Sequence, residues 1–219
     1  MCRPVSGWAA LVNGEPVLWV SETSESHTAT ATEFNLRDSG THRLGAWECY
    51  PNVKSPSHDT DTWIVEWDSD ATAGLRGEPD WSADERAAVE RAIRRHVKRY
   101  VVADGTHEWR GCRMFAFGTA VVRGQTGGKC WCYGTAQSHA QTGGWCWCYD
   151  TARSHAQAGG ECWCFGNAQS HAQAGGECRC YNDARSHAQA GGWCRCFDNA
   201  QSHAQTGGEC WCYGNRDIL

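Results

Sequence analysis

From Gly127 onward, small and large side chains alternate strictly along the chain. In the segment that begins at Gly159, the even positions carry Gly, Cys, Ala and Ser, whereas the odd positions carry Glu, Trp, Phe, Gln and His. An alternation of period two places successive side chains on opposite faces of a strand. The even positions stay small in every repeat, while the odd ones vary between Lys, Trp and Glu or between Trp and Arg. We therefore expect the even positions to face inward and the odd positions to face outward.

This alternation belongs to a repeat of 16 residues, first complete in GGKCWCYGTAQSHAQT at Gly127. Residues 111–126 form a degenerate first copy, and residues 207–219 form a truncated last one. Each copy has Gly-Gly at one corner and Gly, Asp or Asn at the other, and the two octads between these corners have similar patterns. A fixed period of this kind indicates stacked units that cannot bury their apolar faces alone. The sequence predicts a mainly β protein, in which residues 111–219 form a two-sided parallel β-solenoid of about seven coils spaced ~4.8 Å apart.

Residues 1–110 have no repeat and predict a small α+β domain. Apolar runs on both sides of Asn13-Gly14 predict a β-hairpin. Further strands are expected at Ala46–Tyr50 and Thr62–Trp67.

A helix is expected from Ser82 to about Val102. Ser82 and Glu85 have the spacing of a capping box. The buried stripe is expected to contain Val89, Ile93, Val97 and Val101, and Asp104-Gly105 to end the helix. We expect this helix to lead into the first coil and to cover the open end of the solenoid, because an uncovered strand edge promotes aggregation.

Composition changes this picture in two respects. The 219 residues include 25 Gly, 15 Cys and 13 Trp, which is typical of secreted disulfide scaffolds, but here the cysteines follow the repeat. The formal net charge is −5, no apolar run approaches the ~20 residues of a membrane helix, and the first residues lack a signal-peptide pattern. We expect a cytoplasmic protein with no membrane partner and no general coat of nucleic acid.

Several short segments resemble an uncharacterised family of bacteriophage and prophage proteins that start Met-Cys and continue into octapeptide repeats. The matching segments are Met1-Cys2, Val5-Ser6-Gly7, Val17-Leu18-Trp19, Ser26-His27, Leu36-Arg37-Asp38 and Glu78-Pro79-Asp80-Trp81. The resemblance implies an association with phage, and hence the host cytoplasm, but no established activity. The array is also similar to the 16-residue β-solenoid of ice-nucleation proteins, although its outward rows contain Gln, His, Trp and Tyr in place of Thr.

The repeat contains six Cys-x-Cys pairs, which are candidate ligands for a soft metal ion such as zinc or copper(I). Residues i and i+2 on a strand lie ~6.5–7 Å apart, whereas a tetrahedral zinc site needs sulfurs within about 4 Å of one another. Disulfides between stacked coils meet a similar obstacle, because Cβ atoms about 4.8 Å apart exceed the usual spacing. We therefore expect small buried thiols and no cofactor, with metal binding as the alternative for Cys130, Cys132, Cys146, Cys148, Cys162, Cys164, Cys178, Cys180, Cys194, Cys196, Cys210 and Cys212.

Two outward rows of the repeat are also candidate sites. Five histidines, one in each complete copy, form a column that we interpret as a solvated ladder flanked by glutamines, sensitive to acid because stacked imidazoliums repel each other. The aromatic rows stack at a favourable spacing and form an unusual apolar strip, which we take as the binding face. It contains Trp131, Tyr133, Trp147, Tyr149, Trp163, Phe165, Tyr181, Phe197, Trp211 and Tyr213.

The N-terminal domain offers two weaker candidates. Removal of Met1 exposes Cys2 as an N-terminal nucleophile, with His27 and Glu33 as possible helpers. The second half of the predicted helix is basic. Positively charged side chains are also favourable near a helix C-terminus, because they interact with the helix dipole, so we do not expect nucleic acid as a partner.

The sequence thus predicts a repeat protein without enzymatic activity that binds a protein partner or associates with itself through the aromatic face. The alternative is a small hydrolase that depends on Cys2 and uses the solenoid as a targeting surface. A thiol-rich metal binder is the third possibility.

Overall fold

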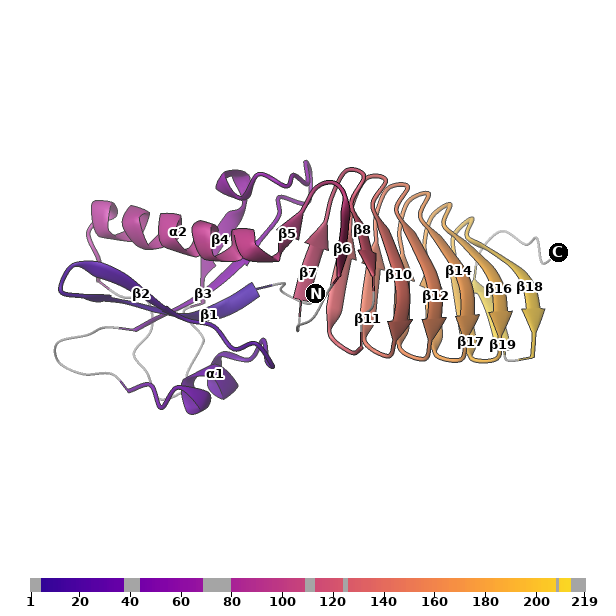
Figure 1. Cartoon of the computed structure of the whole chain (residues 1–219), viewed down its shortest axis with the longest axis horizontal. Helices are drawn as coiled ribbons and strands as arrows, with labels where there is room; N and C mark the ends of the chain where they lie inside the picture. Colours follow the sequence, from indigo (N-terminus) through magenta and orange to yellow (C-terminus); the bar gives the residue numbers. More distant parts are fainter. Residues whose placement is uncertain are drawn as a thin grey trace. The chain divides into compact units, whose positions relative to one another are not determined.

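The computed structural model describes residues 5–37, 44–68, 80–108, 113–123, 126–207 and 209–213. The chain divides into two compact units, Met1–Arg99 and Tyr100–Leu219. The first unit is a small α+β fold, and the second is a parallel β-solenoid with coils of about 16 residues (Figure 1). The predicted fold class is confirmed.

The first unit is built on an antiparallel sheet with the strand order β2-β1-β3-β4. The predicted hairpin is present, with Asn13 and Gly14 both at positive φ in its turn. The last strand starts two residues later than expected, because Asp59 caps a short 3₁₀ turn at Thr60–Thr62. The strands of this sheet are β1 (Val5–Val12), β2 (Glu15–Trp19), β3 (Gly45–Tyr50) and β4 (Ile64–Trp67).

Two helices accompany this sheet. Helix α2 (Ala83–Val97) starts with the predicted capping box, in which Ser82 and Glu85 exchange hydrogen bonds. Its buried residues are Val89, Ile93 and Val97, and it packs on the sheet of its own unit. Helix α1 (His27–Glu33) was not predicted, because its alternating threonines have low helix propensity; Ser26 caps it.

The predicted extension of α2 to Val102 is wrong. The helix ends at Val97, a 3₁₀ turn covers Lys98–Tyr100, and Val101 belongs to strand β5. In β5, Val101 and Val102 pair in parallel with Phe115 and Ala116. Both valines are β-branched and favour a strand, so Val101 pairs in the sheet and does not extend the buried face of the helix. The solenoid sheets therefore begin at Val101, ahead of the predicted first coil, and the covering of that coil by α2 stays a prediction.

The solenoid has two parallel sheets, one on each side of the coil. The first has eight strands: β5 (Val101–Val102), β7 (Arg113–Ala116), β9 (Lys129–Cys132), β11 (Trp145–Cys148), β13 (Glu161–Cys164), β15 (Glu177–Cys180), β17 (Trp193–Phe197) and β19 (Glu209–Tyr213). The second has seven: β6 (Thr106–Glu108), β8 (Val121–Arg123), β10 (Gln137–Thr142), β12 (Arg153–Ala158), β14 (Gln169–Ala174), β16 (Arg185–Ala190) and β18 (Gln201–Thr206). Within the complete repeats each residue pairs with its equivalent in the next coil, for example Cys146 with Cys162.

The interior of the solenoid is thin and is filled from both sheets. The described cysteines from Cys130 to Cys196 are 0–1 % exposed, as are the serines that begin with Ser138 and end with Ser186. The predicted inward orientation of these even positions is confirmed. Ala174 is an exception, because it adjoins the Gly-Gly corner and is exposed. The side chains of Ala172 and Gln173 lie outside the described residues.

The Gly-Gly corner is required by close packing of successive coils. Gly160 has a φ of +77°, and a Cβ built on it would lie 2.4 Å from the carbonyl oxygen of Gly144 in the preceding coil. Only glycine satisfies both conditions. At the opposite corner the positive φ of Asp150, Asn182 and Asp198 explains why Asp and Asn alternate with Gly there.

The predicted histidine column is present on the second sheet as a continuous stack. Ring centroids of His139, His155, His171, His187 and His203 lie 4.5–5.2 Å from one coil to the next. Gln137 and Gln169 hydrogen-bond the rings two residues ahead of them, but Arg153 occupies this position before His155. The His155 Nε2 has no hydrogen-bond partner among the described residues. Burial, the adjacent rings and Arg153 lower the pKa of His155 to about 4.

We expect this stack to make the solenoid sensitive to acid. The pKa values of His139, His155, His171 and His187 in the folded protein lie below the ~6.5 of an unfolded histidine. The unfolded chain therefore binds more protons, and stability falls as pH drops from about 6.5 toward 4. His155→Gln should reduce this slope, as measured by urea unfolding at several pH values. His58→Gln, at an exposed position in the other unit, is the control; an equal slope in all three proteins contradicts the prediction.

A second prediction concerns the interior. Replacing Cys162 and Cys164 together by Ser should lower the free energy of unfolding by about 1–3 kcal/mol for each hydroxyl, because thiols are weak hydrogen-bond partners for a buried hydroxyl. The Ala double variant should lose less, because alanine already fills the interior at Ala168. Chemical denaturation followed by circular dichroism measures both values. Equal stability of the Ser variant and the parent argues against an apolar interior.

Candidate functional site: the outward face of the eight-stranded sheet

Three columns of equivalent residues line the outward face of the first sheet. We call them the first, second and third columns, according to their order along each strand. The first column contains Lys129, Trp145, Glu161, Glu177, Trp193 and Glu209. The second contains Trp131, Trp147, Trp163, Arg179, Arg195 and Trp211, and the third contains Tyr133, Tyr149, Phe165, Tyr181, Phe197 and Tyr213.

The aromatic rings stack as the sequence predicts. Rings of the third column lie 4.8–5.3 Å apart with nearly parallel planes. In the second column Trp131 stacks on Phe115 at 4.8 Å and on Trp147 at 4.9 Å. These distances fall in the range of favourable aromatic pairs, so the stacks stabilise the coil-to-coil contact.

The predicted strip is not continuously exposed. Trp131 is 3 % exposed, Trp147 is 7 % exposed, and Tyr133 is also buried. Stacking covers both faces of Trp131, and Trp145 packs its edge against Trp147 at 5.7 Å. Burial raises the pKa of Tyr133 well above its usual value. These residues therefore belong to the packed structure and not to an accessible binding surface.

Exposure is concentrated elsewhere on the same face. Trp145 is 38 % exposed and Trp193 is 56 % exposed, while Trp211 and Tyr213 are about half exposed. Trp145 and Trp193 were not among the predicted site residues. The sequence feature that could have indicated their exposure is the variation of the first column between Lys, Trp and Glu, because only an outward position tolerates such changes.

Charged side chains accompany these tryptophans. Glu177 accepts a hydrogen bond from Arg179 at 2.7 Å and lies 3.3 Å from Arg195. The Arg179 hydrogen bond lowers the pKa of the Glu177 carboxyl below its ordinary value. The Arg179 guanidinium also lies 4.5 Å from the ring centroid of Trp163, within the range of a cation–π contact.

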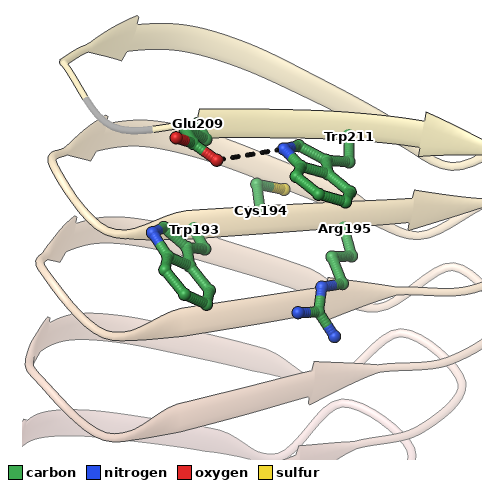
Figure 2. A pocket seen from close by; sticks show the side chains of 5 residues that line it. All are labelled: Trp193, Cys194, Arg195, Glu209 and Trp211. Carbon is green, nitrogen blue, oxygen red and sulfur yellow. Dashed lines mark hydrogen bonds between the residues drawn. The ribbon is translucent and has the colours of Figure 1, made fainter.

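An open groove of about 450 Å³ runs along the first column. Gly160, Gly176 and Gly192 line it together with Glu161 and Glu177, and Trp145 and Trp193 contribute from its two outermost coils. A smaller hollow of about 80 Å³ adjoins it (Figure 2). There Trp193 and Arg195 project from one strand, and Glu209 and Trp211 project from the next. Trp211 Nε1 donates a hydrogen bond of 3.2 Å to the Glu209 carboxylate. Trp193 lines both hollows and is the most exposed tryptophan among the described residues.

The cysteine row lies beneath these columns, on the inward face of the same strands. The two sulfurs of each pair are 3.6–3.7 Å apart from Cys130/Cys132 through Cys194/Cys196. The expectation that these sulfurs are too distant to share a metal ion is therefore wrong. It used the spacing of the backbone, whereas the side chains of a pair lean toward each other. The Cys210 side chain lies outside the described residues, and Cys212 is exposed.

The predicted helpers of Cys2 are separated in the structure, and Cys2 itself lies outside the described residues. His27 Nε2 is 3.0 Å from the carbonyl oxygen of Trp47, and its Nδ1 is 3.2 Å from Asp68. The carboxylate beside His27 is therefore that of Asp68, and Glu33 is exposed at the end of α1. Because both ring nitrogens are engaged, His27 connects α1 to the sheet.

The basic residues at the end of α2 and in the following 3₁₀ turn are partly engaged within their own unit. Arg94 donates to the carbonyl oxygen of Trp63 and pairs with Glu90, and Arg99 in the turn pairs with Glu22. The expectation that nucleic acid is not a partner stays a prediction.

In the part of the chain that the structure describes, no helix has the length and apolar character needed to cross a membrane. The chain matches none of the known protein-family models, none of the curated proteins and none of the solved structures with which it was compared.

Proposed function

We propose that the solenoid is an assembly module without enzymatic activity, which pairs with a second copy of the chain through its outward face. The observation that carries this proposal is the exposure of Trp145 and Trp193 at the two ends of one groove. Exposed tryptophans arranged in this way are a typical feature of protein interfaces, where aromatic residues contribute most of the affinity.

The order of residues along the columns favours a second copy as the partner. Across four coils the first column reads Trp, Glu, Glu, Trp, and the second reads Trp, Trp, Arg, Arg. A two-fold axis parallel to the strands, placed between two facing sheets, reverses the order of the coils but keeps each column opposite itself. Under this operation each residue of the first column faces a residue of the same type. Each tryptophan of the second column faces an arginine of the other copy.

This pairing brings complementary side chains together. Trp145 meets Trp193 of the second copy, which forms two aromatic contacts per dimer. Trp163 meets Arg179 of the second copy, so this guanidinium lies against a tryptophan ring. Glu161 and Glu177 meet across the axis, where Arg179 and Arg195 neutralise the carboxylate of Glu177. The order of tryptophan and arginine side chains along the face is thus complementary to itself.

The first test replaces the exposed tryptophans by the residue that other coils carry in the same column. Trp145→Glu and Trp193→Glu should each weaken dimerisation by about 30-fold or more, the loss expected for a hot-spot residue. The two losses should be similar, because the two-fold axis relates both positions. Sedimentation equilibrium over a range of concentrations measures them. Trp211→Arg, which changes an equally exposed tryptophan outside the four coils, is the control and should dimerise like the parent.

A further prediction distinguishes this arrangement from other self-associations. The double variant Trp145→Glu with Trp193→Arg places a carboxylate opposite a guanidinium at both contacts. It should therefore dimerise more strongly than either of its two component variants, Trp145→Glu alone and Trp193→Arg alone. A parent that is monomeric at every concentration, or a double variant weaker than both single variants, excludes the proposed dimer. The far-ultraviolet circular dichroism of all variants should remain that of the parent, because these side chains point away from the interior.

A further inference from the structure

The geometry points to the interior cysteine row as a binding site for copper(I) ions, held by two overlapping triangles of cysteine sulfurs. This inference is independent of the proposed dimer, because the row lies on the opposite side of the sheet from the exposed tryptophans. It rests on the positions of the sulfurs, on the shape of the row and on the absence of charge around it.

The sulfurs form overlapping triangles along the solenoid. Those of Cys130, Cys132 and Cys146 lie within 4.8 Å of one another, as do those of Cys146, Cys148 and Cys162. A trigonal ion with metal–sulfur bonds of about 2.3 Å, the zinc value, needs sulfurs about 4.0 Å apart. Each triangle therefore needs only small side-chain movements to close on an ion. Cys146 belongs to both triangles, so its sulfur can bridge two ions.

The shape of the row selects the coordination geometry. All these cysteines project inward from a single sheet, so their sulfurs form a flat ladder two atoms wide. A tetrahedral site needs a fourth sulfur outside this plane. In the described coils the facing sheet supplies alanines and serines there, for example Ala168 and Ser170. A flat array of thiolates suits the trigonal geometry of copper(I) and not the tetrahedral geometry of zinc.

The charge of the surroundings favours the same ion. The described side chains that are buried in the interior of the solenoid are those of Ala, Cys, Val and Ser, and none of them carries a charge. Each copper(I) that enters a triangle displaces one thiol proton to solvent and is held by the resulting thiolate and by the sulfurs of the two neutral thiols, so the net charge of the interior does not change. Zinc bound by four thiolates carries a charge of −2, which is costly to bury without a nearby cation.

Access to the row sets the conditions of the experiment. The cysteines from Cys130 to Cys164 are fully buried, so ions must enter while the coils form. The reduced full-length protein is therefore unfolded and refolded without oxygen in the presence of copper(I), supplied as its acetonitrile complex. The product is passed over gel filtration with a copper(I) chelator, and copper per chain is measured by elemental analysis together with copper–thiolate luminescence.

We expect the parent to retain more than one copper per chain, to show the luminescence of a water-shielded copper–thiolate cluster, and to melt at a higher temperature than the copper-free protein. Replacing Cys162 and Cys164 together by Ala should reduce the copper content and the luminescence. Cys49→Ala, which removes a buried thiol outside the row, is the matched control and should retain the parent's content. Cys162→Ala alone is the milder variant if circular dichroism shows that the double variant does not fold.

Three results would overturn the inference. The first is that the chelator removes all copper from the refolded parent. The second is that the double variant retains as much copper as the parent. The third is that refolding with zinc gives a chelator-resistant metal content equal to that of copper, which would show that the row does not select a trigonal monovalent ion.

Discussion

The in-register stacking of identical coils is the constraint on which the rest of this structure depends. Parallel strands lie about 4.8 Å apart, and each residue lies directly above its equivalent in the preceding coil. A side chain is therefore tolerated only if it packs against copies of itself. Aromatic and imidazole rings meet this condition by stacking, small residues meet it in the thin interior, and glycine meets it at the corner where Gly160 approaches Gly144.

The same constraint gives the interior its chemical character. Because one sheet contributes cysteines at two positions per coil, stacking aligns them into a continuous row of sulfurs. Alanine in both positions would leave the row unreactive and would need a thinner coil. Cysteine fills the space with a polarizable atom and also creates potential ligands at every coil. Packing and metal binding are therefore compatible roles for this row. Burial favours an uncharged interior, and a copper(I) ion that replaces one thiol proton adds no charge to it.

On the outward face, the positions that depart from the repeat are the ones that can define a binding partner and its register. A perfectly regular column is the same at every coil and cannot define a particular partner or register. The first column changes from Trp145 to Glu161 and returns to tryptophan at Trp193, and the second changes from Trp163 to Arg179. Each change lies on the outward side, where a solenoid tolerates substitution because each coil contacts only its neighbours. Among these irregular positions Trp145 and Trp193 are exposed, whereas Tyr133 in the regular third column is buried.

The sequence by itself determined those features that depend on local periodicity and local capping. Alternation of small and large residues specified the strands and the inward cysteines, the positive-φ corners required Gly, Asp or Asn, and Ser82 with Glu85 specified the start of α2. The tertiary structure decided the features that depend on contacts distant in sequence. Pairing with Phe115 drew Val101 into a strand, stacking between coils buried Trp131, and Asp68 reached His27 across the fold. The sulfur separations also belong to this second group, because they depend on how side chains lean within a packed interior and not on the spacing of the backbone that carries them.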